Sequence, residues 1–174
     1  MSLEKEMKFR VKNFAEIEEK LLGLGFALQK ETVQEDLYFS PPHRKFAGTR
    51  KHYLRLRKRG NRPSLFAYHE VLNDLETEET ETKIGNTEKF IAILEKLNFV
   101  LDCVVKKKRK VYRNDLFEVA LDEVDNLGLF VELEYLGEPN TDSSPLFRKL
   151  VGKLGLKKKN QISGLGYPDL ICKE

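Results

Sequence analysis

Several residues of this sequence have the types and the spacing that bind metal ions and phosphates. Glu4, Glu6 and Lys8 follow one another two residues apart near the N-terminus. In an extended chain, side chains two residues apart lie on the same face. Two carboxylates and an ammonium on one face suit a divalent cation together with an anion. An ordinary amphipathic strand with its polar face in water has the same spacing, so this segment alone leaves both interpretations open.

Three later segments repeat charged residues at alternate positions. They carry the pairs Arg55 and Arg57, Lys107 and Arg109, and Glu132 and Glu134. Arginine offers phosphate oxygens a planar fork and lysine offers them a point charge, whereas carboxylates supply the oxygen ligands of divalent metals. The repeated pattern predicts a charged lining that binds phosphates through its cations and metal ions through its carboxylates.

Helices and strands that could position these residues are indicated along the whole chain. Three helices are predicted from apolar stripes and end signals: one capped by Asn13, one opened by Asn86 or Thr87, and one with Pro145 in its first turn. Strands are predicted near residues 4–9, 32–39, 53–59, 65–71, 76–83, 106–112, 116–124 and 130–135.

The two halves of the chain echo each other. The Glu-x-Glu-x-Lys pattern, followed by a helix and a strand ending in tyrosine, recurs from Glu79 at an offset of roughly 73 to 75 residues. Two such halves close most economically into one antiparallel barrel with the helices outside. The charged faces then line the interior, where ions or a ligand must compensate them. The alternative is a sandwich whose charged faces are solvated.

Length and composition indicate one soluble globular domain that spans residues 1–174. The 31 lysines and arginines nearly balance the 28 aspartates and glutamates, so any preference for a polyanion must come from their arrangement. No apolar run is long enough to span a membrane, and the charged N-terminus argues against a signal peptide. Cys103 and Cys172 lack metal-ligand spacing, which is typical of reduced thiols in a cytoplasmic protein.

A run of five cations, residues 106–110, could be taken for a nucleic-acid patch. On a strand, however, Lys107 and Arg109 face one way and the other three cations face the other way. No helix-turn-helix, zinc-finger or RNA-recognition motif accompanies the run, so we do not expect nucleic-acid binding.

Taken together, the motifs resemble the CYTH family, which is named for class IV adenylyl cyclases and thiamine triphosphatases. They occur in the family's order and span essentially the whole chain. The matching motifs are Glu4-x-Glu6-x-Lys8, Gln34-x-Asp36-x-Tyr38-Phe39, Leu54-Arg55-Leu56-Arg57, Lys107-x-Arg109-x-x-Tyr112, Leu121-Asp122-Glu123-Val124-x-x-Leu127-Gly128-x-Phe130-Val131-Glu132-x-Glu134 and Tyr167-x-Asp169-Leu170.

The resemblance implies an α+β fold, a closed eight-stranded antiparallel β-barrel with helices packed outside, which binds a triphosphate and a divalent metal in its tunnel. The carboxylates expected to hold Mg²⁺ or Mn²⁺ are Glu4, Glu6, Asp122, Glu132 and Glu134, and catalysis is expected to depend on Glu4, Glu6 and Glu134. The residues expected to bind phosphates are Lys8, Arg55, Arg57, Lys107 and Arg109.

One position departs from the family pattern. The strand after the arginines usually ends in a lysine, but this sequence has His69 there. We expect a bound triphosphate to raise the pKa of His69, so that its imidazolium replaces the lysine. Alternatively, His69 faces outward, or Lys51 or one of residues 157–159 supplies the missing cation from a loop. Glu79 and Glu81 are further candidates for the tunnel wall, although a solvated face would explain them equally well.

The resemblance implies three functions. The first is cyclisation of ATP to cyclic AMP and pyrophosphate by a class IV adenylyl cyclase, which the 121–134 motif favours. The second is hydrolysis of the terminal phosphate of tripolyphosphate or thiamine triphosphate. The third is a non-catalytic module that binds nucleotide or polyphosphate. In each case the partner is a triphosphate small molecule, neither membrane nor nucleic acid is expected, and a homodimer stays open.

Overall fold

The computed structural model describes residues 2–46, 48–49, 51–60 and 62–171. Within these ranges Cys103 is a half-buried thiol, whereas the second cysteine, Cys172, lies outside them. No helix of the described ranges has the length and apolar character needed to cross a membrane.

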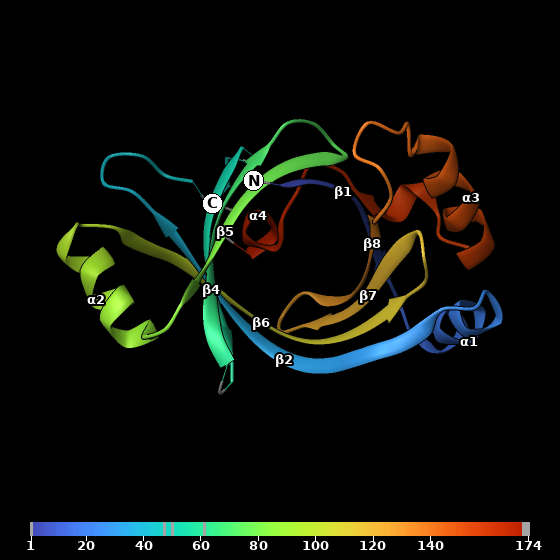
Figure 1. Cartoon of the computed structure of the whole chain (residues 1–174), viewed down its shortest axis with the longest axis horizontal. Coiled ribbons are helices and arrows are strands. Elements are labelled where there is room, and N and C mark those ends of the chain that lie inside the picture. The colour runs from blue at the N-terminus through green and yellow to red at the C-terminus, as the bar shows by residue number, and fades with distance from the viewer. Residues whose placement is uncertain (1, 47, 50, 61, 172–174) are drawn as a thin grey trace. The chain divides into compact units, whose positions relative to one another are not determined.

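The strands form one sheet in the order β5-β4-β3-β2-β6-β7-β8-β1-β9, and β5 also pairs with β1. This additional pairing closes the eight long strands into an antiparallel β-barrel, which confirms the predicted α+β fold (Figure 1). The strands are β1 (Ser2–Val11), β2 (Ala27–Ser40), β3 (His52–Arg59), β4 (Arg62–Val71), β5 (Glu76–Ile84), β6 (Val100–Arg113), β7 (Phe117–Val124), β8 (Gly128–Tyr135) and β9 (Gln161–Ile162).

Helices follow the first, fifth and eighth strands, as the sequence predicted. They are α1 (Ala15–Gly23), α2 (Thr87–Lys96) and α3 (Ser144–Leu154), and the tail adds the 3₁₀ turn η1 (Lys158–Asn160) and the short helix α4 (Tyr167–Ile171). Pro145 lies in the first turn of α3, and the helix ends at Gly155, whose left-handed φ of 74° suits a residue without a Cβ. The echo between the two halves is visible as β1-α1-β2 and β5-α2-β6.

The chain forms two compact units that do not follow the two sequence halves. Unit 1 comprises residues 1–3, 33–107 and 164–174, and unit 2 comprises residues 4–32 and 108–163. Strands β1, β2 and β6 contribute residues to both.

In unit 1, α2 covers one face of the sheet formed by β2, β3, β4 and β5. Leu94 of α2 packs with Leu37, Phe39 and Leu56 of the strands in one core cluster. The Phe90 ring meets a phenylalanine of β4 edge to face at 4.7 Å between centroids. Residues of the opposite parity lie on the other face, which we call the charged face of unit 1.

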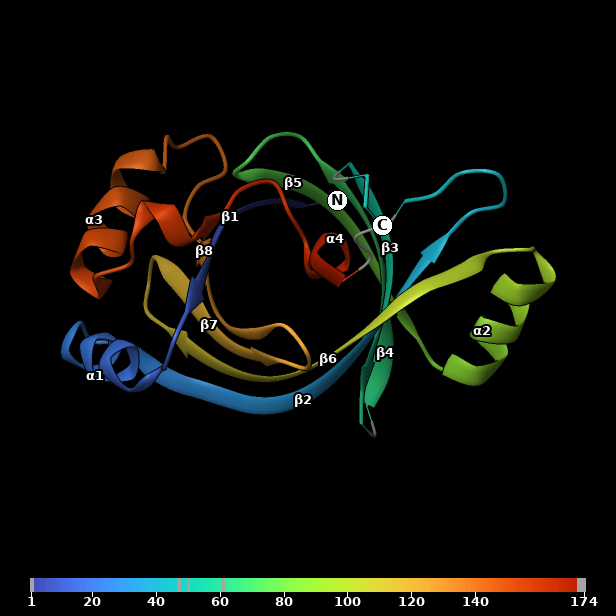
Figure 2. The same ribbon diagram turned by 180° about the vertical axis from the view of Figure 1, so that it is seen from behind.

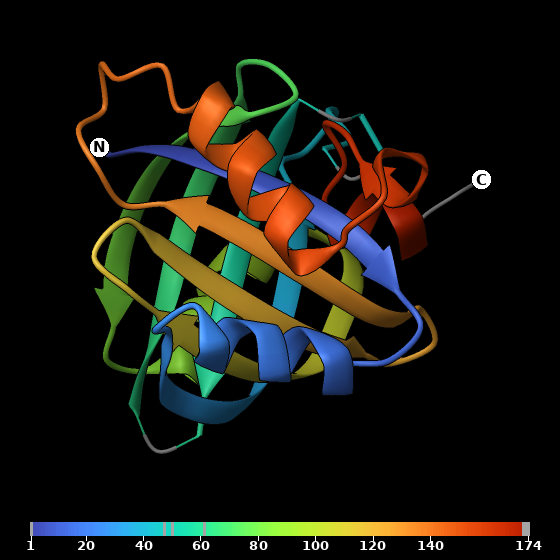
Figure 3. The same cartoon turned by 90° about the vertical axis from the view of Figure 1, so that its right-hand side faces the viewer.

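In unit 2, α1 and α3 cover one face of the sheet formed by β7, β8 and β1 (Figure 3). Phe147 of α3 is fully buried and meets Phe117 of β7 edge to face at 5.2 Å. On β8, Val131 and Leu133 share this apolar face and are both fully buried. The residues between them define the charged face of unit 2.

Helix capping differs at the first two helices, and this difference gives a test. The Asn86 side chain accepts a hydrogen bond from Lys89 N at 2.8 Å and caps α2. The predicted Asn13 cap was wrong, because Phe14 is the N-cap of α1 and no side chain caps that helix.

We expect Asn86→Ala to lower the free energy of unfolding by about 1 kcal/mol. Asn13→Ala is the control and should change it by only a few tenths of a kcal/mol in urea titrations. Equal losses in the two variants would contradict the capping assignment.

Candidate functional site

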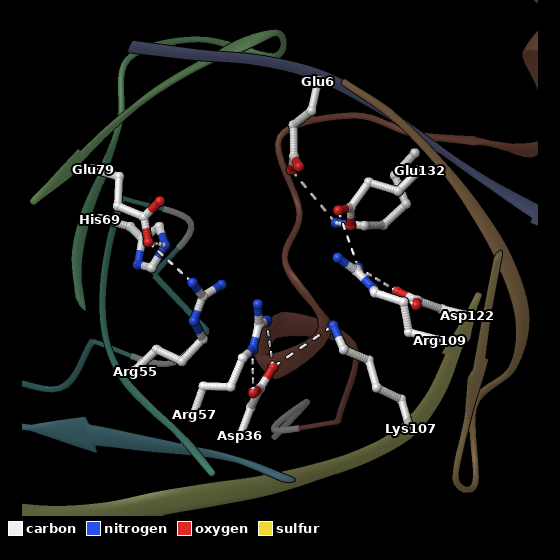
Figure 4. Close-up of polar contacts among 11 residues, drawn as sticks. Glu6, Asp36, Arg55, Arg57, His69, Glu79, Lys107, Arg109, Asp122 and Glu132 are labelled. Atoms are coloured by element: carbon white, nitrogen blue, oxygen red, sulfur yellow. Dashed lines mark hydrogen bonds and ion pairs between the residues drawn. The ribbon is translucent and has the colours of Figure 1, made fainter. Parts of the chain in front are cut away.

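Two groups of charged side chains occupy the charged faces, one in each unit. The cationic cluster of unit 1 consists of Asp36, Arg55, Arg57, His69, Glu79 and Lys107. The carboxylate cluster of unit 2 consists of Glu6, Lys8, Arg109, Glu118, Asp122, Glu132 and Glu134. Figure 4 shows the ion pairs within each cluster.

Asp36 is the central anion of one half of the cationic cluster. Its two oxygens accept hydrogen bonds from Arg57 Nε at 2.7 Å and from Arg57 Nη2 at 2.8 Å. Lys107 Nζ lies 3.6 Å from the same carboxylate. Burial alone would raise the pKa of Asp36, but Arg57 and Lys107 hold it well below its usual range. A charged, bidentate pair therefore fixes the Arg57 guanidinium on the sheet.

Glu79 is the anion of the other half of this cluster. Its Oε1 accepts a hydrogen bond from Arg55 Nη2 at 3.0 Å and lies 2.9 Å from His69 Nε2 (Figure 4). These contacts follow from the register of β4 and β5, which places Glu79 directly opposite His69. Among the described side chains, Arg55 Nε and His69 Nδ1 are buried atoms without a hydrogen-bond partner.

Helix α4 closes over part of the charged face of unit 1 (Figure 2). The buried Tyr53 hydroxyl donates a hydrogen bond to the Asp169 carboxylate, which also accepts from Gly48 N at 3.1 Å. Lys107 Nζ lies 5.0 Å from the centre of the Tyr167 ring, a cation–π distance. The Tyr167-x-Asp169-Leu170 motif, quoted above for its family resemblance, therefore contacts residues on the charged face of unit 1.

In the carboxylate cluster, Arg109 and Lys8 bind glutamates and an aspartate. Arg109 donates to both oxygens of the fully buried Asp122, at 2.6 and 2.5 Å, and its Nη2 also lies 3.0 Å from Glu132. Lys8 Nζ lies 3.3 Å from Glu132 and 3.5 Å from Glu6. Burial by itself would lower the pKa of Lys8, but Glu6 and Glu132 raise it above its usual value.

Carboxylates are in excess around Glu134. The register places Glu134 opposite Glu6 on β1 and opposite Glu118 on β7. Burial, followed by the charges of Glu132, Glu118 and Glu6, raises the pKa of Glu134 to about 7. Because these carboxylates repel one another, a cation bound among them would be stabilised by several of them at once.

The chemistry of this donor set fits a hard divalent cation. Mg²⁺ and Mn²⁺ prefer carboxylate oxygens, which Glu6, Glu118 and Glu134 present from three adjacent strands. In the described ranges, no three acidic, histidine or cysteine side chains already converge closely enough to hold an ion.

The structure places every predicted site residue on a charged face, and Glu4 is half-buried near Glu6 on β1. Lys107 is buried while Lys106 and Lys108 are exposed, as the parity argument predicted. His69 is buried, so the alternative in which it faces outward was wrong. Of the two open candidates, Glu79 is buried and Glu81 is exposed.

Two residues of the clusters received no role from the sequence. Glu118 lies on the same face of β7 as Asp122, so the alternation along that strand could have identified it. Asp36 lay within a quoted motif, but its pairing with Arg57 depends on the register between β2 and β3. That register cannot be read from either segment alone.

Comparison with known proteins agrees with this architecture. The model of the CYTH domain family matches residues 2–165. A protein of Methanocaldococcus jannaschii named "Putative adenylate cyclase" is 35% identical over 134 residues, which are 76% of each chain. The PH1012 protein of Pyrococcus horikoshii OT3 is 30% identical, with a TM-score of 0.83 over 96% of this chain and 98% of that one. A Hippeastrum protein at 19% identity shares the fold, with a TM-score of 0.61 over 90% and 89% of the two chains.

Proposed function

Because the chain belongs to the CYTH family, we propose that it is a metal-dependent enzyme that acts on a triphosphate. The reaction we place first is that of a class IV adenylyl cyclase, which converts ATP to cyclic AMP and pyrophosphate. The similarity to the M. jannaschii protein, which bears an adenylate cyclase name, supports this choice.

The observation that carries the proposal is the set of buried and half-buried cations in unit 1. Arg55, Arg57 and Lys107 share one sheet face with the carboxylates Asp36 and Glu79. Their side chains are between 2% and 16% exposed, and burying an excess cation is costly unless an anion compensates it. A triphosphate supplies several negative charges, and the unpartnered Arg55 Nε is a donor that a phosphate oxygen would satisfy.

The carboxylate cluster supplies the ligands that the proposal requires for Mg²⁺ or Mn²⁺. Glu6 and Glu134, together with Glu4 and Glu132, would hold the metal. Both oxygens of Asp122 already accept hydrogen bonds from Arg109, so Asp122 would bind the metal only by sharing those oxygens with it. When bound, the metal would neutralise phosphate charge and polarise the bond that breaks. Lys8 and Arg109 would balance the glutamates and contact phosphate oxygens.

A second candidate is hydrolysis of the terminal phosphate of tripolyphosphate or thiamine triphosphate. The Hippeastrum protein is described as having a dominant triphosphatase activity although it is named an adenylyl cyclase. The two clusters consist of groups that bind phosphates and metals, and such groups serve either reaction. A non-catalytic module that binds nucleotide or polyphosphate is the third candidate.

Product analysis distinguishes the three functions. The purified protein would be incubated with ATP, tripolyphosphate or thiamine triphosphate, each with Mg²⁺, with Mn²⁺ or with EDTA. We expect cyclic AMP and pyrophosphate from ATP, and no turnover in EDTA. Orthophosphate without cyclic AMP would contradict the cyclase reaction and support the triphosphatase reaction. Calorimetric binding without any product would contradict both enzymatic proposals.

A further inference from the structure

The two carboxylates of the cationic cluster hold their arginines in different ways. Asp36 is fully buried and accepts from Arg57 through both oxygens, at 2.7 and 2.8 Å. Glu79 accepts from Arg55 Nη2 through Oε1 at 3.0 Å, and the same oxygen lies 2.9 Å from His69 Nε2 (Figure 4). Arg57 is therefore fixed by a bidentate pair, whereas Arg55 is held through one nitrogen by an oxygen that it shares with a histidine.

The contact with Glu79 leaves Arg55 incompletely paired and open to a ligand. Arg55 Nε is a buried donor without a hydrogen-bond partner among the described side chains, and an unpaired buried donor costs free energy. The side chain as a whole keeps 16% of its surface exposed, so a ligand on the charged face of unit 1 can contact it. Exchanging Glu79 for another anion therefore sacrifices a single charge-assisted hydrogen bond of Arg55.

Glu79 places a negative charge on the face that is proposed to bind phosphates. Arg55 and Arg57 are two residues apart on β3, so their side chains lie on the same face, about 7 Å apart along the strand. Lys107 lies on this face as well, 3.6 Å from the Asp36 carboxylate that holds Arg57. A triphosphate that extends from Arg57 to Arg55 meets the Glu79 carboxylate there. The two anions repel each other, and both require the same guanidinium.

We propose that Glu79 is an internal competitor for phosphate, which occupies Arg55 in the free protein and which a triphosphate must displace in order to bind there. This inference rests on the proposed function and assigns to Glu79 the control of triphosphate affinity. No covalent bond changes in the exchange, because one charge-assisted hydrogen bond to Arg55 replaces another. Asp36 does not compete in this way, since its bidentate contact fixes Arg57 and stays in place.

Calorimetric titration with tripolyphosphate tests the competition, in EDTA so that no metal ion contributes. Glu79→Gln removes the negative charge but keeps the size of the side chain and an oxygen that accepts from Arg55, so the variant should stay folded. We expect it to bind tripolyphosphate about 10-fold more tightly than the wild type, because phosphate then gains Arg55 without displacing a carboxylate. Unchanged binding would overturn the inference. Weaker binding would also overturn it, because Glu79 would then position Arg55 for phosphate.

Glu81→Gln is the matched control. Glu81 lies two residues further along β5 and is exposed, and the strand register places it opposite Ala67 instead of His69. Its replacement removes the same charge from the same strand, but it should change the affinity for tripolyphosphate by no more than about twofold. Equal gains in the two variants would overturn the inference, because the effect would then come from net charge and not from competition at Arg55.

The gain in affinity should also depend on Arg55. Adding Arg55→Ala to Glu79→Gln removes the guanidinium for which carboxylate and phosphate compete. The double variant should therefore bind tripolyphosphate about 10-fold more weakly than Glu79→Gln alone, in a double-mutant comparison of contacting residues. If the double variant, folded by circular dichroism, kept the full gain, the inference would be wrong.

Stability gives a second readout, which separates competition from a purely structural role. Without ligand, Glu79→Gln should melt at a lower temperature than the wild type, because Arg55 loses its charged partner. Saturating tripolyphosphate should then raise its melting temperature by more than it raises that of the wild type. A lower melting temperature without this larger ligand effect would mean that Glu79 is only structural.

Glu79→Asp extends the test, because it keeps the charge in the fold but draws the carboxylate back from Arg55 by one methylene. Its affinity for tripolyphosphate should lie between those of the wild type and Glu79→Gln, and an affinity below that of the wild type would contradict the competition. Binding by the wild type without a gain in Glu79→Gln overturns this inference alone. Absence of binding by the wild type and by Glu79→Gln alike would overturn the proposed function and the inference with it.

Discussion

Replacing Glu6 or Glu134 by glutamine is expected to abolish metal-dependent turnover while the protein stays folded. Glu134 lies opposite Glu6 in the β1–β8 register, and both carboxylates belong to the set proposed to hold Mg²⁺ or Mn²⁺. An amide is a weaker, uncharged ligand for a hard cation. Loss of one metal-binding carboxylate should lower kcat/KM by roughly 100-fold or more, since charge stabilisation of this kind contributes several kcal/mol. Initial rates over a range of Mn²⁺ concentrations measure the loss.

Glu123→Gln is the matched control. This glutamate lies on β7 but faces outward, where it is exposed and pairs with Lys108 at 3.4 Å. Its replacement should leave turnover unchanged. In EDTA, Glu134→Gln should melt no lower than the wild type, because the substitution removes a carboxylate whose charged form is opposed by burial and by its neighbours. Full activity of both cluster variants at saturating Mn²⁺ would contradict the metal-site proposal.

Strand alternation was sufficient to predict which residues share the charged faces. In a strand the side-chain period is two whatever the tertiary structure, so parity survives folding. The run from Lys106 to Lys108 shows this clearly: the side chain of Lys107 is 2% exposed, whereas its neighbours are 59% and 71% exposed. Placed on β6, the run is therefore divided between a buried and an exposed face.

The partner of each charge could not be predicted, because partners depend on register and on distant contacts. Glu79 and Glu81 have the same parity, yet only Glu79 lies opposite His69 and is buried. Lys5 faces the apolar side of β1 and is buried because its ammonium donates to the Thr141 carbonyl, 136 residues away. Neither the burial of Glu79 nor the contact between Lys5 and Thr141 can be predicted from a local sequence pattern.

The surroundings of His69 could not be predicted, because its partners come from neighbouring strands. From sequence, its position suggested either a replacement for the family's lysine or a side chain that faces outward. The structure places Glu79 across the β4–β5 register from His69 and Arg55 beside Glu79, so the histidine is buried among charged partners. The short elements β9 and α4 were also beyond prediction, since two and five residues carry no readable period.

Arg57→Ala is expected to weaken tripolyphosphate binding by about 2–5 kcal/mol, because a buried phosphate oxygen loses a charge-assisted partner. The Arg57 side chain is 13% exposed, and Asp36 holds it in a fixed orientation. Lys108→Ala is the control of opposite parity on an exposed surface, and it should change binding by no more than a few tenths of a kcal/mol. Calorimetric titration with tripolyphosphate and Mg²⁺ measures both.

Arg57→Ala also removes two hydrogen bonds from Asp36, whose side chain is fully buried, so the variant should unfold more easily. Arg57→Lys separates this effect from binding, because it keeps a positive charge beside Asp36 but offers phosphate a single ammonium instead of a fork. Its affinity should fall between those of the wild type and Arg57→Ala, at a temperature where all three are folded. Equal affinities in Arg57→Ala and Lys108→Ala would mean that the charged face of unit 1 does not bind the phosphates, and the proposed function would then lose the observation that carries it.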